Sequence, residues 1–256
     1  MQNKKPIKEL TDAQLMRYSR HIMLKDFDID GQERISNSSA IIIGLGGLGC
    51  AVAQYLSASG VGKLVLVDDD EVDSSNLQRQ VLHYESNIRT KKVLSAKQTI
   101  NMINSEIDVE TIAQRLSQKQ LEKLIKQHDI VVDCCDNLET RNQLNHLCFL
   151  AKTPLVSGAA IRFEGQVSVF GMQPGQACYQ CLSKTFEEQT LTCVDAGVLS
   201  PLVGMVGSMQ AIEAIKLLAN VGIPLFNSLI TIDASTMNIN RFTINPSNTC
   251  PTCGGH

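Results

Sequence analysis

The sequence predicts an α/β fold: a Rossmann-like, mostly parallel sheet with helices on both faces, then a mixed or antiparallel C-terminal part with a four-cysteine zinc knuckle. Three observations lead to this prediction. Short apolar runs alternate with helix-like segments through most of the chain, as in β-α-β units. A glycine-rich turn follows the first of these runs, and two Cys-x-x-Cys pairs lie in the C-terminal third.

Composition sets the broad class of protein. The chain has 256 residues, 43% of them hydrophobic, without a repeat or linker, so we expect one domain over 1–256 with a loose tail at about 1–10. The net charge of −3 gives no basic field for nucleic acid. We find no signal segment and no apolar run near the roughly 18 residues of a membrane span. We therefore expect a cytoplasmic protein that binds neither nucleic acid nor membrane.

The first β-α-β unit, residues 40–70, carries a nucleotide-binding pattern. Its first strand, 40–43, leads into a G-x-G-x-x-G turn with one extra glycine, at Gly44, Gly46, Gly47 and Gly49. A helix beginning at such a turn presents free N–H groups to an anion. Asp68 ends the second strand about 20 residues further on, where this kind of fold bonds a ribose. These residues predict a nucleotide site but leave NAD and ATP as alternatives.

The other elements follow from hydrophobic periodicity and from capping and turn residues. We expect helices at 12–25, 90–103, 118–127, 140–152 and 199–219, and strands at 63–67, 107–112, 130–134, 154–160, 166–170, 229–233 and 240–244. Residues 172–198 are irregular in pattern. The long apolar helix at 199–219 contains Gln210, Glu213 and Lys216, so it is too polar to span a bilayer.

Polar side chains gather where the predicted strands end. Residues 75–80 follow the second strand, Asp136 and Asn137 follow the strand at 130–134, and Lys92 lies on the helix at 90–103. Open α/β sheets bind ligands at the carboxyl ends of their strands. Arg79, Lys92 and Asp136 supply the two cations and the carboxylate that a magnesium–triphosphate site needs.

Three classes of function remain open on these residues. An NAD-dependent oxidoreductase would place an acid such as histidine at the site, but none of the five histidines lies at an obvious strand end. A nucleotidyl transferase that activates a carboxylate needs no general base, because that nucleophile is ionised at pH 7. A non-enzymatic scaffold would have no use for the charges of Arg79, Lys92 and Asp136.

Nine cysteines without a secretion signal indicate reduced thiols or metal ligands. Two Cys-x-x-Cys pairs, separated by 68 residues, predict a structural Cys₄ zinc site: Cys178, Cys181, Cys250 and Cys253. Four thiolates close the tetrahedron and leave no position for a catalytic water. The alternative is a redox pair, which needs only one such motif. Cys134, Cys135 and Cys148 are interpreted as small buried hydrophobic residues.

With these motifs described, the chain resembles the ubiquitin-activating-like adenylyltransferases. The resemblance rests on GLGGLG, VDDDEVDSSNLQRQ, CCDN, CYQCL, LTCVDAGVLSPLVG and CPTC, and it covers about Leu15 to Cys253. It implies ATP-dependent adenylation of the C-terminal glycine carboxylate of a ubiquitin-like sulfur-carrier protein ending in Gly-Gly, with release of pyrophosphate. The segments RYSRHI and VSGAAIRFEGQVSVF resemble members that act on the small subunit of molybdopterin synthase, in molybdenum cofactor biosynthesis. Members that act on the thiamine-pathway carrier are the alternative.

The resemblance also implies roles for the matching residues. It puts Asp68 on the ribose, Lys92 on the phosphates and Mg²⁺ on Asp136. The ATP-binding set that it implies is Gly47, Asp68, Asp70, Ser75, Asn76, Leu77, Gln78, Arg79, Gln80, Lys92, Asp136 and Asn137. The catalytic set that it implies is Arg20, Arg79, Lys92 and Asp136.

The same resemblance implies partners. Arg20 matches an arginine that enters the neighbouring subunit's site, which implies a homodimer with two carriers per dimer. No further domain follows Cys253, so we expect a separate sulfur donor. Cys193 matches a position where relatives place a thiol for sulfur or acyl transfer, although adenylation itself needs no thiol. We therefore expect Cys193 to be an accessory thiol at most.

Overall fold

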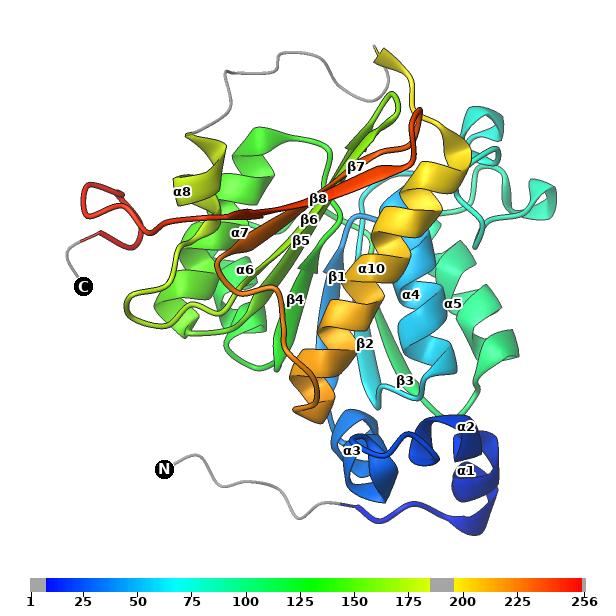
Figure 1. The fold of residues 1–256 in the computed structure, drawn as a ribbon. Coiled ribbons are helices and arrows are strands. Elements are labelled where there is room, and N and C mark those ends of the chain that lie inside the picture. The colour runs from blue at the N-terminus through cyan, green and yellow to red at the C-terminus, as the bar shows by residue number, and fades with distance from the viewer. Residues whose placement is uncertain (1–7, 185–195, 255–256) are drawn as a thin grey trace.

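One eight-stranded sheet runs through the computed structural model, which describes residues 8–184 and 196–254 (Figure 1). The strand order is β3-β2-β1-β4-β5-β6-β7-β8; the first five strands pair in parallel, and the last three pair antiparallel. The strands are β1 Ser39–Ile43, β2 Lys63–Val67, β3 Asp108–Ile112, β4 Ile130–Asp133, β5 Leu155–Ile161, β6 Glu164–Phe170, β7 Ser228–Asp233 and β8 Asn238–Thr243. The predicted fold class is confirmed.

Helices cover both faces of the sheet because side chains alternate along its central strands. In β1, Ile42 faces the core shared with α4, α5 and α10, whereas Ile41 faces the core shared with α6, α7 and α8. The helices are α1 Asp12–Arg17, α2 Ser19–Ile22, α3 Asp28–Ser36, α4 Gly47–Ala58, α5 Lys92–Ile103, α6 Gln118–Ile125, α7 Leu138–Ala151, α8 Tyr179–Ser183 and α10 Ser200–Ala219. Two 3-10 turns, η1 Ser74–Asn76 and η2 Glu85–Asn87, lie between β2 and α5.

The longest helix, α10, is the core helix of the first face. Within the described residues it alone is long and apolar enough to cross a membrane, with a mean hydropathy of 1.4, but half of that stretch is buried in the protein. It packs against α4 and lies across β5 and β6 (Figure 1). Gln210, one of its polar residues, is fully buried and donates to the carbonyl of Asp133 at 2.7 Å. The polar residues of α10 thus serve contacts inside the fold.

The N-terminal region differs from the sequence prediction. The helix expected at 12–25 breaks at Tyr18, whose backbone leaves the helical range at ψ 12°. The Tyr18 ring is buried against Gly60, and its hydroxyl accepts from Asn104 at 2.8 Å. Tertiary packing of one side chain therefore overrides the local helical pattern. Helix α3 has no sequence counterpart in the prediction, because only Gly31, Gln32 and Ile35 of its residues are buried.

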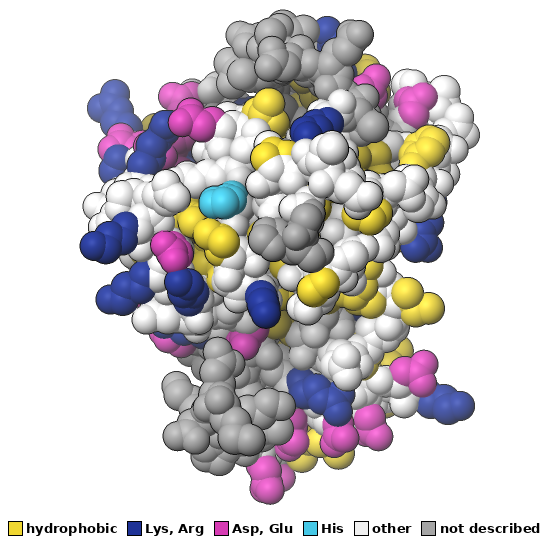
Figure 2. Space-filling model, turned by 90° about the vertical axis from the view of Figure 1, so that its left-hand side faces the viewer, with side chains coloured by type: hydrophobic (Ala, Val, Ile, Leu, Met, Phe, Trp, Pro, Cys, Tyr) yellow, Lys and Arg dark blue, Asp and Glu magenta, His cyan; other side chains and the backbone are white. Residues whose placement is uncertain are grey.

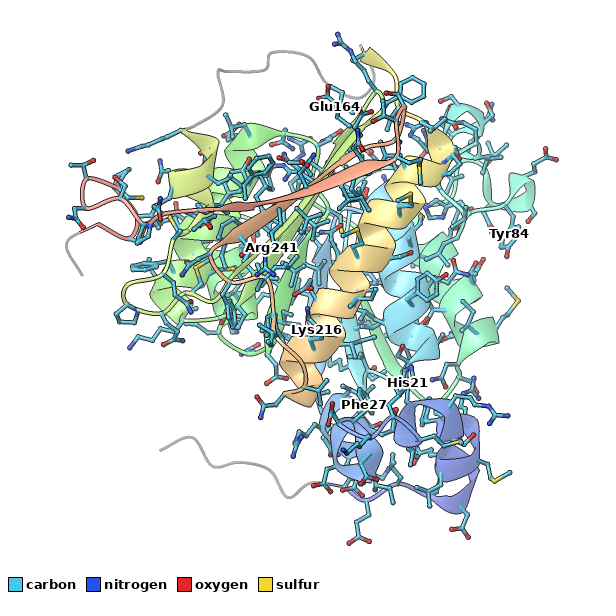
Figure 3. The ribbon with its side chains drawn as sticks, in the orientation of Figure 1. His21, Phe27, Tyr84, Glu164, Lys216 and Arg241 are labelled. Atoms are coloured by element: carbon cyan, nitrogen blue, oxygen red, sulfur yellow. The ribbon has the colours of Figure 1, made fainter. Side chains whose placement is uncertain are left out.

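The short helices α2 and α3 are held together by ring packing. His21 and Phe27 lie with ring centroids 5.2 Å apart (Figure 3). Gln32 is fully buried; its Oε1 is 3.2 Å from Nδ1 of His21, and its amide donates to the carbonyl of Ser59 at 2.9 Å. These contacts place the N-terminal helices at the end of α4 that is remote from its glycine turn. They therefore cover the amino-terminal edge of the parallel strands.

A buried ion pair joins β4, β5 and α7. The Asp133 carboxylate is 3.4 Å from the Arg141 guanidinium and accepts from the Ser157 hydroxyl at 2.8 Å. Arg141 also donates to the backbone carbonyls of Cys135 and Gly158. The pair satisfies the hydrogen-bonding groups of a strand end that water does not reach, which explains how both charges are tolerated there.

Replacing Arg141 with Met should destabilise the protein by about 3–5 kcal/mol, because the buried Asp133 carboxylate loses its partner. Urea unfolding followed by far-UV circular dichroism measures the difference. The matched control is Lys126→Met, which removes a solvent-exposed pair with Glu122 on α6 and should change little. Equal stability of Arg141→Met and wild type would contradict this assignment.

Candidate nucleotide site and cysteine cluster

The glycine turn lies between β1 and α4 at the carboxyl edge of the parallel strands, as predicted. Gly44 has φ +91°, and a Cβ there would lie 2.8 Å from the carbonyl oxygen of Cys134. A Cβ on Gly49 would lie 1.9 Å from the carbonyl oxygen of Gly44, so the turn closes only with glycine. Gly46 caps α4, and Gly47 is its first residue. The free N–H groups of α4 therefore point out at the sheet edge, ready for an anion.

Asp68 ties the end of β2 to this turn. Its Oδ2 accepts from the backbone N–H of Leu45 at 2.7 Å, and its Oδ1 accepts from the backbone N–H of Asp70 at 2.8 Å. Each carboxylate oxygen keeps a second lone pair, so a ribose hydroxyl could still donate to it. The residue expected to bind the ribose is thus also part of the scaffold of the turn.

Lys92 is the buried cation of the site. It is the first residue of α5, its side chain is 7% exposed, and its ammonium lies 2.8 Å from the Asp70 carboxylate. On the face of the molecule drawn in Figure 2, Lys and Arg side chains are interspersed with Asp and Glu. With a net charge of −3, attraction of a triphosphate must come from individual residues such as Lys92.

The segment between β2 and α5 is held by its own side chains. Asp73 caps η1, accepting from the N–H of Ser75 at 2.8 Å and from its hydroxyl at 2.6 Å; these hydrogen bonds lower the pKa of Asp73. Arg79 donates to the carbonyl of Ser75 at 3.0 Å, and Asn76 completes the cap. Leu77 follows η1, and the carbonyl of Gln78 accepts from Ser200 at the start of α10.

Gln80 stands out in this segment because of its buried side-chain oxygen. The residue is 3% exposed, and its Oε1 has no hydrogen-bond partner among the described residues. Its Nε2 lies 3.9 Å from the position that a Cβ on Gly46 would take. The side chain therefore lies beside the glycine turn with an unused acceptor. Such a buried acceptor fits a site that awaits a donor group or a water.

Asp136 and Asn137 follow β4 at the same edge, as predicted. Asp136 is exposed, and its Oδ1 is 3.5 Å from the amide of Asn137. Asn137 also caps α7, since its Oδ1 accepts from the N–H of Thr140 at 2.9 Å. A separate group of carboxylates, Asp68, Asp69 and Asp70, has oxygens within 4.8 Å of one another. Asp136 is not part of that group.

Sequence reasoning missed Arg115, a cation at this edge. Its guanidinium lies 3.0 Å from the Asp69 carboxylate. That hydrogen bond raises the pKa of Arg115, and the nearby charges of Asp70 and Asp136 act in the same direction. Arg115 follows β3, so the position of that strand end beside β2 was the available signal. The arginine brings positive charge among three carboxylates of the site.

Arg20 lies away from the other predicted residues. It is exposed on α2 and contacts the sulfur of Met23 at 3.6 Å. Because α2 covers the amino-terminal edge of the strands, Arg20 does not join the glycine turn of its own chain. A role of this residue in the nucleotide site thus requires a second chain. Cys193 lies outside the described residues.

The structure brings the four predicted cysteines together. All four sulfurs lie within 4.8 Å of one another, with Cys178 and Cys250 at 3.6 Å and Cys181 and Cys253 at 3.4 Å. A disulfide would need about 2.05 Å, whereas zinc–sulfur bonds of about 2.3 Å in a tetrahedron hold sulfurs about 3.8 Å apart. The redox-pair alternative does not explain why two motifs meet. The four sulfurs and their spacing fit a metal ion coordinated by four thiolates.

The thiols of this cluster have pKa values shifted in opposite directions: burial raises the pKa of Cys178 and Cys253, whereas that of Cys250 is lowered. Burial opposes ionisation of Cys250, but backbone N–H groups of Cys253 and Thr252 and neighbouring thiols lower its pKa to about 7. Asn145 of α7 donates to the sulfur of Cys178 at 3.5 Å. Burial raises the pKa of Cys134, Cys135 and Cys148, so these thiols stay neutral. Cys134 and Cys148 are buried, as predicted, whereas Cys135 is partly exposed.

The sequence is similar to those of known proteins over nearly its whole length. It is 49% identical over 246 residues to the molybdopterin-synthase adenylyltransferase of Escherichia coli strain K12, covering 96% of this chain and 99% of that protein. It is 40% identical over 246 residues to the sulfur carrier protein ThiS adenylyltransferase of the same strain, covering 96% and 98%.

Solved structures of similar fold also match most of the chain. A crystal structure of E. coli MccB with ATP superposes with a TM-score of 0.77 at 26% identity, covering 88% of this chain and 69% of that one. The pattern that defines the ThiF family matches residues 18–252, from the break between α1 and α2 to the second Cys-x-x-Cys motif. Together with the 49% identity to a curated adenylyltransferase, this match shows that the chain belongs to the ThiF family.

Proposed function

We propose that this protein uses ATP to adenylate the C-terminal glycine carboxylate of a ubiquitin-like sulfur carrier, releasing pyrophosphate, in molybdenum cofactor biosynthesis. The observation that carries the proposal is the continuous hydrogen-bonded chain from Lys92 through Asp70 and Asp68 to Leu45. It holds a buried cation and a helix N-terminus at one sheet edge, an arrangement that suits a triphosphate. The name of the 49%-identical relative supports the same reaction.

The chemistry asks mainly for positioning and charge neutralisation. A glycine carboxylate is ionised at pH 7, so it attacks the α-phosphorus without a general base, and the pyrophosphate leaves from the opposite side. Lys92, Arg79 and the N-terminus of α4 would offset charge on the phosphates, and Asp68 would orient the ribose. Asp136 would hold Mg²⁺, which neutralises phosphate charge when bound. No histidine or cysteine is needed for this step.

The choice of carrier distinguishes the two nearest alternatives. The relative named for molybdopterin synthase is 49% identical, and the one named for ThiS is 40% identical. The difference favours the small subunit of molybdopterin synthase, with the thiamine-pathway carrier as the second candidate. An NAD-dependent oxidoreductase is disfavoured, because curated relatives across the whole chain are named adenylyltransferases.

The proposed assembly is a homodimer. Arg20 is exposed at the edge opposite the nucleotide site, and this placement suits a residue that reaches into the site of a second chain. Two such sites would accept two carriers per dimer. A separate protein would supply sulfur after adenylation. In each chain Cys178, Cys181, Cys250 and Cys253 would hold a structural Zn²⁺, which supplies cross-linking and no reaction step.

Changing Asp136 to Asn should keep the fold and lower the rate by about a hundredfold or more, the scale of one preorganised electrostatic group. The measurement is carrier-dependent exchange of labelled pyrophosphate into ATP, run with the molybdopterin-pathway and the thiamine-pathway carriers. The control Cys193→Ala should stay within a few-fold of wild type. If Cys193→Ala loses exchange while Asp136→Asn keeps it, a thiol acts first and the proposed mechanism is wrong.

Elemental analysis of the purified protein should find about one zinc per chain, since four thiolates fill one tetrahedral site. Cys250→Ser should lose that metal and melt at a lower temperature, yet retain some exchange activity. The matched control is Cys148→Ser, a buried cysteine outside the cluster, which should keep the zinc. Zinc near zero, with four titratable thiols at the cluster, would refute the site.

If Arg20 serves the site of the neighbouring subunit, a dimer of Arg20→Ala subunits should lose adenylation. Mixing that variant with Asp136→Ala subunits should restore up to about one active site per mixed dimer, because one site then has both native residues. Pyrophosphate exchange is measured before and after the subunits are mixed. Subunit exchange without recovery of activity would show that Arg20 does not act on a partner's site.

A further inference from the structure

His83 connects the glycine turn to the helix that begins with Lys92. It is 4% exposed, whereas its neighbour Tyr84 points into solvent (Figure 3). Its Nδ1 lies 2.9 Å from the hydroxyl of Ser95, one turn into α5, and its Nε2 lies 3.2 Å from the carbonyl oxygen of Leu45. One buried ring thus contacts two elements of the nucleotide site.

These partners fix the protonation of the ring. A backbone carbonyl only accepts, so Nε2 carries the proton and donates to Leu45, and Nδ1 accepts from the Ser95 hydroxyl. Burial lowers the pKa of His83 below its ordinary 6.5, and the nearby charge of Lys92 lowers it too; the Leu45 hydrogen bond and Asp68 oppose this. The ring is therefore neutral at pH 7, with the proton on Nε2.

Leu45 is held from both sides. Its N–H donates to Asp68, and its carbonyl accepts from His83 and also faces the Cys50 thiol at 3.4 Å. Cys50 is a weak donor, and burial raises its pKa to about 12, so it stays a neutral thiol. His83 is thus the main donor that holds the Leu45 peptide against α5. Losing it would free the turn to move relative to Lys92.

We propose that His83 is a positioning residue for the nucleotide: it sets the glycine turn and Lys92 at the separation that binds the phosphates. This rests on the proposed ATP-dependent function. His83 itself touches no phosphate and transfers no proton. Its effect should fall on ATP affinity and leave affinity for the carrier unchanged.

The test compares two substitutions of His83. His83→Gln keeps a side-chain N–H that can reach the Leu45 carbonyl, whereas His83→Phe keeps the ring shape and removes the donor. Titration calorimetry with Mg-ATP should show a Kd within about threefold of wild type for the first and at least about tenfold weaker for the second. In the exchange assay His83→Phe should raise the KM for ATP and leave the KM for the carrier unchanged. The matched control, His128→Phe, changes a histidine after α6 and should keep ATP affinity.

Two further measurements separate this inference from a failure of the proposed function. Hydrogen exchange without ligand should show faster exchange of the Leu45 amide in His83→Phe than in His83→Gln, even if wild type binds no ATP. If His83→Phe does not fold, Ser95→Ala takes its place; it removes the hydroxyl that orients the ring and should weaken Mg-ATP binding by several-fold. Wild-type ATP affinity and Leu45 exchange in the folded variant would overturn the inference.

A pH series tests the neutral ring. Because the folded pKa lies below 6.5, the unfolded state binds a proton first as pH falls, so wild type loses stability relative to His83→Gln between about pH 7.5 and 5.5. The charged groups near the ring, Asp68 and Lys92, are the same in both proteins. A stability difference that does not change with pH would overturn the neutral assignment.

Discussion

The buried pair of Asp133 and Arg141 is the interaction on which the arrangement of the site depends. It lies where β4 ends, and the carbonyls of Cys135 and Gly158 converge on the same guanidinium. Replacing a buried ion pair with apolar residues often costs no stability, so the contribution of this pair is better described as specificity. We interpret it as the contact that sets the path of the chain from β4 into α7. Asp136 is placed by that path.

The sequence predicted what local pattern and chemistry determine. Strand-like patterns located the described strands of the sheet, and the repeated Cys-x-x-Cys motif located a cluster whose two pairs lie 72 positions apart. The break at Tyr18 could not be predicted, because it depends on packing against Gly60 and Asn104, which are distant in sequence. Arg115 was missed for a similar reason. The pairing of β3 with β2 brings it to Asp69, and no motif around Arg115 marks that contact.

Several residues at the carboxyl edge of the parallel strands, where we propose that ATP binds, combine two tasks. Asp68 holds the turn while keeping lone pairs for a ligand, and Asn137 caps α7 beside Asp136. Such sharing makes single substitutions hard to interpret, since a lost contact to ligand and a displaced turn lower activity alike. Gln80 differs, because its buried Oε1 has no partner in the described residues. Its acceptor is available without disturbing the scaffold.

The cysteine cluster has a consequence for the unfolded chain. Cys178 and Cys250 lie 72 positions apart, with β7 and β8 between them, so a bound metal would close a long loop that contains the antiparallel edge of the sheet. Cross-linking a loop of that length removes conformational entropy from the unfolded ensemble, by about 4 kcal/mol on the scale known for disulfides. The edge strand β8 pairs only with β7 among the described strands. Fraying of this edge from the C-terminal end would then have to wait for the metal to dissociate, so the rate of metal release would set the lifetime of the edge.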